Sequence, residues 1–481
     1  MTALLRFRPI DADEYRGATA LRLGREIAAG SLSPVQLTEL ALDIAAAAEP
    51  TINAYAFFRR EKALREAAEL ETEAKRGSLR SVLHGIPMAV KDNMCLAGEP
   101  TFKGSRTSAA DPAAVSSPMV DRLVRAGTVV IGKTTTPEFG WKGTGISPRT
   151  GVTRNPWNPA RNSGGSSAGS AATVAAGGVP VALGSDAGGS IRIPASFCGV
   201  VGLKPTLGAI PVWPGTVNET LSHVGPLTRS VADARTVLAL ARGADPRDPQ
   251  SAYPAALRDE PGRRLRVGVV RAPFGVEPEA PVREVAELAY AALRGGGMAE
   301  FSDAELAMPV PRGIFEAMWV TGRGLGFASL IRAHADIMDP GLVRLLPLAE
   351  QYSLADYYAA VEARRVFNAE LFAVFCRVDL LVMPTMPLTA FAAEAEVPDG
   401  GEADAKLPWL TWTPYTYAFN ISGQPAVSIP CGLAADGLPV GLQVIGPWGH
   451  DLRVLDFAQA CEDTLAGMAT DRALSGLRTK Q

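Results

Sequence analysis

GGSSAGSAATVAAGGVPVALGSDAGGSIRIPASFCGVVGLKPT, residues 164–206, is the stretch that decides the fold of this chain. Glycine and serine alone would be typical of a flexible linker, but here they surround apolar segments. Residues 170–176 have the small-residue pattern of a helix, and residues 179–183 have the apolar pattern of a strand. Residues 185–190, SDAGGS, are typical of a tight turn. We therefore expect ordered structure in this stretch.

The predicted turn has the composition of a site that stabilises negative charge. Gly188 and Gly189 allow successive backbone N–H groups to point toward one place, where preorganised donors can hold a developing alkoxide. Ser190 follows directly, so its hydroxyl would lie beside those donors. We predict that Ser190 is a nucleophile next to its own oxyanion hole. A strand-to-loop turn that contains a hydrogen-bonded serine is the alternative.

The nucleophile needs a base, because an unassisted serine hydroxyl is weakly nucleophilic. The four histidines, His84, His223, His334 and His450, lie in no glycine-rich or serine-rich context. No G-x-S-x-G motif surrounds Ser190 either, which argues against an α/β-hydrolase with a histidine partner. Lysine is the remaining candidate.

Lys91 is the candidate base. It follows the apolar run 86–90, which reads as a buried strand, so its side chain would emerge at the edge of a core. Burial can lower the pKa of a lysine by up to ~3–5 units, which makes the neutral amine available near pH 7. From the residues alone, an exposed lysine, or one paired with Asp92, remains the alternative.

Several separated segments resemble the amidase signature family. Its pattern reads GGSS, a small-residue helix, G-(S/T)-D-x-GGS-(I/V)-R-x-P-(A/S) and CG-x-x-GLKPT. The matching segments, in chain order, are residues 84–93 (HGIPMAVKDN), 153–158 (TRNPWN), 164–167, 184–195, 198–206 and 420–446. The resemblance covers most of the chain except about 241–407. It implies an α/β fold, in which one large domain has a central mixed β-sheet covered by helices on both faces.

Length and composition agree with this expectation, because 481 residues of which 47% are hydrophobic and 20% charged can bury one large core. Within the single domain we expect four regions. These are N-terminal helices at residues 1–78, a catalytic core at 79–240, a variable and mostly helical region at 241–407, and a C-terminal return to the core at 408–481.

The resemblance implies a Ser-cisSer-Lys triad at Ser190, Ser166 and Lys91. In that scheme Lys91 takes a proton from Ser166, Ser166 takes one from Ser190, and Ser190 attacks a carbonyl to form an acyl-enzyme. The peptide bond at Ser166 is cis in the family. The implied oxyanion hole consists of the backbone N–H groups of Ala187, Gly188, Gly189 and Ser190. The residues implied to support this loop are Ser167, Asp186 and Arg192.

Three residues differ from those usual in the family, namely Ala168, Ser185 and Ala187, and none of these differences removes a catalytic atom.

Two segments are candidates for the substrate pocket. The loop 139–145 contains glycines that permit close backbone approach, although an ordinary surface loop would contain them too. The aromatic cluster at 409–419 has a density typical of a core, but it precedes a family loop. The candidate pocket residues are Gly140, Trp141, Gly143, Thr144 and Tyr415.

These inferences predict a hydrolase that cleaves amide bonds of small molecules without a metal or an organic cofactor. Esters and carbamates (urethanes) are further candidate substrates, because the nucleophile and the oxyanion hole recognise a carbonyl and not its leaving group. Resemblance to urethane-cleaving members is a further expectation. The first alternative is the glutaminase-type A subunit of a tRNA amidotransferase, which would need partner chains to pass ammonia to a charged tRNA.

A nucleotide-binding protein is the second alternative, because residues 127–134, GTVVIGKT, fit the pattern G-x-x-x-x-G-K-[ST]. A true P-loop follows a strand and opens into a helix. Here the order is reversed, because Ser117 and Pro118 begin a helix that Gly127 ends, and TVVIG is itself the predicted strand. We therefore expect no phosphate-binding loop.

The remaining features exclude other classes. A formal net charge of −3 with no basic run argues against a nucleic-acid partner. No signal peptide is visible at 1–15, and the apolar run 171–184 is interrupted and too short to span a membrane, so we expect a cytoplasmic protein. The 5 cysteines are scattered, so neither a zinc site nor a disulfide framework is expected. A homodimer is a further expectation.

Overall fold

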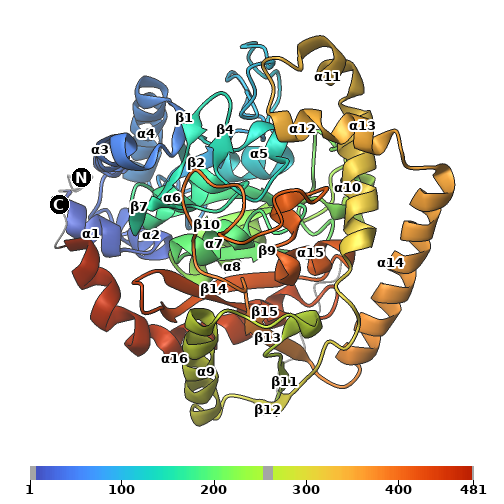
Figure 1. Cartoon of the computed structure of the whole chain (residues 1–481). Coiled ribbons are helices and arrows are strands. Elements are labelled where there is room, and N and C mark those ends of the chain that lie inside the picture. The colour runs from blue at the N-terminus through green and yellow to red at the C-terminus, as the bar shows by residue number, and fades with distance from the viewer. Residues whose placement is uncertain (1–6, 253–263, 479–481) are drawn as a thin grey trace.

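A computed structural model describes residues 7–252 and 264–478, apart from the side chains of Glu219 and of residues 467–478. One mixed sheet of 11 strands runs through the molecule (Figure 1). Its strands, in spatial order, are β1 (Tyr55–Phe58), β3 (Val129–Thr134), β2 (Pro87–Lys91), β8 (Val181–Asp186), β10 (His223–Thr228), β9 (Val201–Lys204), β14 (Ala426–Leu433), β15 (Pro439–Ile445), β13 (Leu380–Pro384), β11 (Arg266–Val269) and β12 (Glu300–Asp303). Two small hairpins lie apart from it, β4 (Ile146–Ser147) with β5 (Gly151–Val152), and β6 (Arg154–Asn155) with β7 (Asn158–Asn162).

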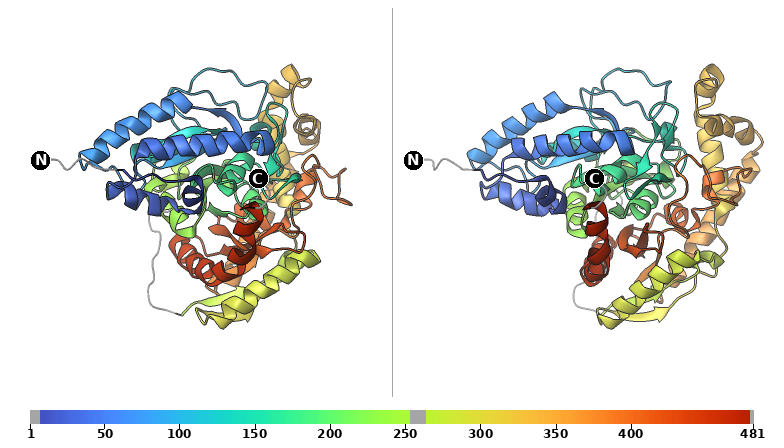
Figure 2. Two further views of the ribbon diagram at one scale, coloured as in Figure 1. Left: turned by 90° about the vertical axis from the view of Figure 1, so that its left-hand side faces the viewer. Right: turned by 60° about the vertical axis from the view of Figure 1, so that its left-hand side comes forward.

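Helices surround the sheet, and those of the first hundred residues lie on the opposite side of the molecule from α10 and α14 (Figures 1 and 2). The helices are α1 (Ala12–Gly17), α2 (Ala20–Ala28), α3 (Pro34–Ile52), α4 (Arg60–Lys75), α5 (Pro118–Arg125), α6 (Ala168–Ala175), α7 (Arg192–Cys198), α8 (Val231–Ala241), α9 (Ala280–Gly295), α10 (Arg312–Gly326), α11 (Ala328–His334), α12 (Pro340–Val343), α13 (Leu345–Ala349), α14 (Leu354–Phe375), α15 (Pro414–Ile421) and α16 (Asp451–Arg478).

Both faces of the sheet are buried, as the alternation along β13 demonstrates. Leu380 and Val382 belong to one hydrophobic cluster, whereas Leu381 and Met383 belong to another. Successive side chains of a strand point to opposite faces, so the two clusters lie on opposite sides of the sheet. Helices α9 and α16 contribute to the first cluster, and α10 and α15 contribute to the second. The expected single α/β domain with a mixed sheet between helices is confirmed.

The predicted turn at 185–190 begins two residues too early. Ser185 and Asp186 still belong to β8, because they pair with Val224 and His223 of the antiparallel neighbour β10. The pairing with β10 extends the strand beyond its apolar residues, and hydrophobicity alone does not reveal it. The turn itself starts at residue 187.

The region that fits a P-loop pattern forms a helix followed by a strand, as expected from its order. Helix α5 ends before Gly127, and both Lys133 and Thr134 lie within β3. Lys133 is buried, and its Nζ lies 3.2 Å from Oδ1 of Asp92. The lysine of the motif therefore pairs with a carboxylate inside the core.

The sheet draws strands from every expected region of the chain. Residues 1–78 supply the edge strand β1 as well as helices, and residues 241–407 supply β11, β12 and β13. The first six residues of the N-terminal segment lie outside the described ranges.

Candidate active site

The site forms where two parallel neighbours end. Strands β2 and β8 pair in parallel, with Val90 opposite Leu183. Lys91 is the last residue of β2, and Ser185 and Asp186 end β8. Carboxyl ends of parallel neighbours meet at one edge of a sheet, which is where open α/β sheets commonly bind ligands. The register thus brings the predicted base beside the glycine-rich turn.

Lys91 lies in a ring of serine hydroxyls. Its Nζ is 2.7 Å from Oγ of Ser166, 2.9 Å from Oγ of Ser185 and 3.1 Å from Oγ of Ser167. The side chain is completely buried. Lys91 is therefore neither an exposed lysine nor the partner of Asp92, and both alternatives from the sequence are removed.

The surroundings of Lys91 favour the neutral amine. Burial lowers its pKa well below the ordinary lysine value, Asp186 opposes this shift, and the positive charge of Arg323 adds to it. Asp186 opposes the shift only in part, since its carboxylate is bound by Arg192 at 3.0 Å. A neutral amine is what a general base requires.

Ser166 and Ser190 come from two loops that lie side by side. The N–H of Ser167 donates to the carbonyl of Ser190 at 3.0 Å, and the peptide bond between Gly165 and Ser166 is cis. Both Ser166 and Ser190 line the same cavity. Within the described part of the chain, Oγ of Ser190 makes no hydrogen bond. Catalytic hydrogen bonds are often loose without substrate and tighten in the complex.

The backbone amides after β8 divide into two groups. The N–H of Gly189 donates to Oδ1 of Asp186 at 2.7 Å. The N–H groups of Ala187, Gly188 and Ser190 donate no hydrogen bond to any other described residue. Of the four amides expected to form an oxyanion hole, three are thus available, and Gly189 instead holds the turn. Gly189 has φ +122°, and a Cβ there would lie 2.3 Å from Oγ1 of Thr416, so only glycine fits.

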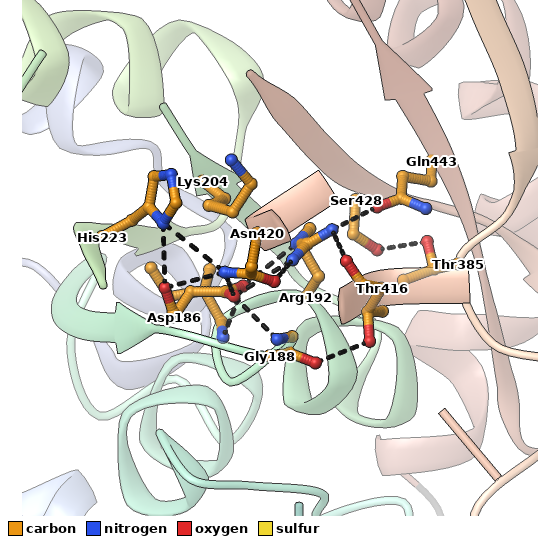
Figure 3. Close-up of polar contacts among 12 residues, drawn as sticks. Asp186, Gly188, Arg192, Lys204, His223, Thr385, Thr416, Asn420, Ser428 and Gln443 are labelled. Carbon is orange, nitrogen blue, oxygen red and sulfur yellow. Dashed lines mark hydrogen bonds and ion pairs between the residues drawn. The ribbon is translucent and has the colours of Figure 1, made fainter. Parts of the chain in front are cut away.

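A buried polar network anchors the turn (Figure 3). Arg192, on α7, donates from Nε to Oδ2 and from Nη2 to Oδ1 of Asp186, each at 3.0 Å. The same guanidinium donates to the carbonyl of Thr416 at 2.9 Å, to Gln443 at 2.8 Å and to Asn420 at 2.7 Å. The network therefore ties β8, α7, α15 and β15 together around the turn that precedes the predicted nucleophile.

Charges in this network are compensated. Burial raises the pKa of Asp186, but the charge and hydrogen bonds of Arg192 outweigh burial and hold that pKa well below its usual range. Burial, followed by the charge of Lys204, lowers the pKa of His223 well below the ordinary histidine value, so His223 is neutral. Because Asp186 and Arg192 are fully buried, removal of either partner would leave an uncompensated charge.

A cavity of about 190 Å³ opens in front of Ser166 and Ser190. Its walls come from the residues after β2, the loop at 139–140, the segment 211–217 and the C-terminal end of α10 with the residue that follows it. Most of its larger side chains are apolar. They include Met94, Met119, Phe139, Val212, Trp213, Val217, Val224 and Phe327.

Of the five candidate pocket residues, Gly140 lines this cavity and the other four lie in the packed interior. The ring of Trp141 packs against Gly341, at the start of α12. Gly143 packs against Trp412, and the hydroxyl of Tyr415 donates to the carbonyl of Val276 at 2.6 Å. The hydroxyl of Thr144 is also engaged, because it donates to Glu396 at 3.2 Å. The expected pocket role of these four residues is therefore corrected.

The physical reason is the aromatic cluster itself. Rings from residues 409–419 stack with Phe197, meet Phe315 and Trp319 in edge-on or tilted contacts, and belong to the second hydrophobic cluster. Buried aromatic area of this extent stabilises a core more than it serves an open pocket. The high density of aromatic residues at 409–419 thus indicates a packed core. Their position next to a family loop in the sequence does not place them in the pocket.

Several cavity residues had no predicted role. Ser185, which differs from the family's common residue, contacts Lys91 and accepts a hydrogen bond from Nδ2 of Asn93 at 2.8 Å. Arg323 and Phe327 belong to a segment without any recognised motif, so no sequence signal could have identified them. Trp213 lies shortly after the GLKPT motif. The prolines near it in the sequence were the one feature that could have drawn attention to this cavity residue.

Metal clusters and membrane-spanning helices are both absent from the described residues. No group of three or more His, Cys, Asp and Glu side chains among them is arranged to hold a metal ion. None of the helices in the described ranges is both long and apolar enough to cross a membrane.

Comparison with known proteins identifies the class. Residues 36–455 match the family model described as Amidase. The chain is 36% identical over 459 residues to the A subunit of the glutamyl-tRNA(Gln) amidotransferase of Chloroflexus aggregans, covering 87% of this chain and 91% of that protein. It is 34% identical to the corresponding protein of Synechococcus sp. strain CC9605, covering 93% of this chain and 96% of that protein.

Solved structures point the same way. A bacterial aryl acylamidase superposes with a TM-score of 0.84 at 26% identity and covers 96% of this chain and 99% of its own. A 6-aminohexanoate cyclic dimer hydrolase also gives 0.84, at 29% identity, with 95% and 98% covered. The fold and the comparisons together define an enzyme that acts on carbon–nitrogen bonds. The chain belongs to the amidase signature family.

Proposed function

We propose that this enzyme hydrolyses small-molecule amides through an acyl-Ser190 intermediate, with Lys91 as the base and Ser166 as a proton bridge. The observation that carries the proposal is the buried contact of 2.7 Å between Nζ of Lys91 and Oγ of Ser166, at the wall of the cavity that Ser190 also lines. Burial lowers the pKa of Lys91, which supports its role as a base.

The valence of a neutral amine suits this arrangement. An uncharged lysine has two N–H donors and one lone pair, and Lys91 has three hydroxyls within 3.1 Å. Ser185 and Ser167 accept the two N–H groups, and the lone pair receives the proton of Ser166. A charged ammonium would have three donors and no acceptor, and it could not take a proton from Ser166.

The reaction follows from these roles. Ser190 Oγ attacks the substrate carbonyl while its proton passes to Ser166, whose own proton passes to Lys91. The free N–H groups of Ala187, Gly188 and Ser190 hold the oxyanion of the tetrahedral intermediate. Collapse breaks the carbon–nitrogen bond, and the leaving amine takes the proton back from Lys91 through Ser166. Water then attacks the acyl carbonyl while its proton passes through Ser166 to Lys91, and collapse breaks the bond to Ser190 Oγ, which regains that proton as the acid is released.

Esters and carbamates are included in the proposal because the same groups act on any carbonyl of suitable size. For a carbamate, either side of the carbonyl can leave, and Ser190 would carry a carbamoyl or an alkoxycarbonyl group. The largely apolar walls of the cavity, which include Met119, Trp213 and Phe327, favour substrates with hydrophobic parts.

A second candidate function is that of the glutaminase-type chain of a tRNA amidotransferase, and the names of the curated relatives favour it. A glutaminase site must hold both the carboxylate and the ammonium group of glutamine. Asp186 is the one carboxylate among the described residues that line the cavity, and Arg192 and Asn420 already bind it. The cavity therefore offers no free acid for an ammonium group, which is why we place amide hydrolysis first.

One experiment separates the two functions. Purified protein is offered anilides, aliphatic amides, esters, carbamates and glutamine, and its mass in solution and any co-purifying chains are measured. Hydrolysis of anilides or carbamates by the isolated chain supports the first proposal. Activity confined to glutamine, together with co-purifying partner chains, would establish the second. The same mass measurement tests the expected homodimer, and nucleic-acid carry-over tests the expected absence of a nucleic-acid partner.

A further inference from the structure

Arg323 is a buried cation without an acidic partner. It lies on α10, lines the cavity, and is only 7% exposed. Among the described residues, no carboxylate lies within ion-pair distance of its guanidinium. Burial lowers the pKa of Arg323 to about 10, so it stays charged at neutral pH. A buried charge without a counter-charge is costly, which indicates that something else compensates it in the working enzyme.

The guanidinium is held in place and keeps donors to spare. Its Nη1 donates to the carbonyl of Phe139 at 2.8 Å. Its Cζ lies 4.5 Å from the ring centre of Trp319 and 5.7 Å from that of Phe327. Within the described structure, Nε and Nη2 make no hydrogen bond. A rigid fork with unused N–H groups is suited to receive a planar anion.

Arg323 is also close to the predicted chemistry. Phe139, which receives its hydrogen bond, is followed by Gly140, and a Cβ at Gly140 would lie 3.1 Å from Oγ of Ser166. The carbonyl group that Arg323 binds thus belongs to the residue just before Gly140, and Gly140 lies against Ser166 of the predicted triad. A substrate that reaches Ser190 can extend to Arg323 without leaving the cavity.

The charge of the cavity points to an anion. Its described lining contains two cations, Arg323 and Lys103, and one carboxylate, Asp186. Asp186 is neutralised by Arg192, and His223, also in the lining, is neutral because burial lowers its pKa. The free charge that faces a substrate is therefore positive.

We propose that Arg323 binds a carboxylate of the substrate, so that the preferred substrates are amides whose acyl or amine part carries an acid group. The inference rests on the proposed amide hydrolysis at the same site. A substrate carboxylate would accept a hydrogen bond from Nη2 of Arg323. It would also supply the negative charge that no described carboxylate of the protein provides. Lys103 lies on the same side, since its carbonyl accepts the N–H of Phe139 at 2.7 Å.

Two substrate pairs test the proposal, each differing only by an isopropyl group in place of a carboxylate of equal size. The first pair varies the acyl part and consists of glutaryl and 5-methylhexanoyl p-nitroanilide. The second pair varies the amine part and consists of the hexanoyl amides of 4-aminobenzoate and 4-isopropylaniline. We expect the anionic member of at least one pair to have a kcat/KM higher by about tenfold to a hundredfold, as charge-assisted hydrogen bonds imply.

Variants assign the preference to one residue. Arg323→Met is expected to bring the ratio of anionic to neutral kcat/KM close to one, mainly through KM, whereas Arg323→Lys keeps part of it. Lys103→Met, the matched control, removes the other cavity cation and is expected to keep most of the ratio. If Arg323 served only to hold the carbonyl of Phe139, Arg323→Met would lower both members alike, and an unchanged ratio would overturn the proposal.

Calorimetry separates this inference from the proposed function. The four amides are bound to Ser190→Ala protein with and without Arg323→Met, so that no turnover is needed. Tighter binding of an anionic member that disappears with Arg323→Met supports the carboxylate site even if the wild type hydrolyses none of them. Hydrolysis without any preference for the anionic members would leave the proposed function standing and refute the role of Arg323.

Discussion

Nζ of Lys91 lies 2.7 Å from Oγ of Ser166, although 75 residues separate them in the chain. The parallel pairing of β2 and β8 makes the contact possible, because it places Lys91 next to the end of β8, where Ser185 also reaches the amine. A buried amine and a hydroxyl at this distance exchange a proton directly. The contact is the geometric basis of the proposed mechanism.

The first prediction concerns the nucleophile. Ser190→Ala should abolish turnover, because the variant lacks the oxygen that attacks the carbonyl next to the free amides of the turn. A fluorophosphonate probe should leave a covalent adduct on Ser190 of the wild type, located by peptide mass spectrometry. Ser185→Ala is the matched control and should still be labelled at position 190. An adduct on Ser166 or Ser185 of the wild type would refute the assignment.

The second prediction concerns pH and activity. The folded-state pKa of Lys91 is lowered, and only the neutral amine accepts a proton, so kcat should fall as the pH drops through that pKa. Lys91→Ala should lower kcat by several orders of magnitude. Stopped assays from pH 5 to pH 10 measure both effects. An acid optimum, or near-normal activity of Lys91→Ala, would remove Lys91 as the base.

The third prediction concerns pH and stability. Between the lowered folded-state pKa of Lys91 and its unfolded value of about 10.4, the unfolded chain binds one more proton, so the wild type gains stability as the pH rises. The Lys91→Met variant lacks this pH-dependent contribution to the free energy of unfolding, so it should be more stable than the wild type near pH 6. The difference should shrink toward pH 10. Denaturant melts across this range measure it, and a pH-independent difference would contradict the lowered pKa.

The fourth prediction concerns the ion pair beneath the turn. Asp186→Asn would leave Arg192 buried without its counter-charge and should cost about 3–5 kcal/mol of the free energy of unfolding at pH 7. Glu394→Gln, in the exposed pair with Arg154, should cost less than about 1 kcal/mol. The stabilisation from Asp186, whose folded pKa is lowered, is present above its unfolded pKa and should be lost only below about pH 4. Equal costs for the two variants would contradict the role of the network.

The fifth prediction separates core aromatics from cavity aromatics. Trp141 is 4% exposed and packed in the second cluster, so Trp141→Ala should cost about 3–5 kcal/mol in stability and leave the order of substrate preference unchanged. Phe327 lines the cavity, so Phe327→Ala should change KM severalfold for substrates with bulky apolar groups. Melting curves and a substrate series distinguish the two, and altered preference in Trp141→Ala would restore its pocket role.

Local patterns in the chain are sufficient to predict several individual elements of the fold. The apolar run before Lys91, the helix–strand order around residues 127–134 and the glycine-rich turn before Ser190 each depend on neighbours in sequence, and the structure has them. The end of β8 cannot be predicted in this way, because pairing with β10, and not local hydrophobicity, extends it to Asp186. The meeting of Lys91 with Ser166 is implied by the resemblance of the catalytic segments and not by any local pattern.

The sequence by itself thus determined the type of fold and which residues could carry the chemistry, chiefly because separated motifs resemble one family, while hydrophobic period and glycine positions determined individual elements over short distances. The tertiary structure alone decided what surrounds those residues. It buried Trp141 and Tyr415, engaged the amide of Gly189 with Asp186, and set Arg323 into the cavity wall. Long-range packing makes most of these choices, since they depend on segments that are far apart in the chain and share no local pattern.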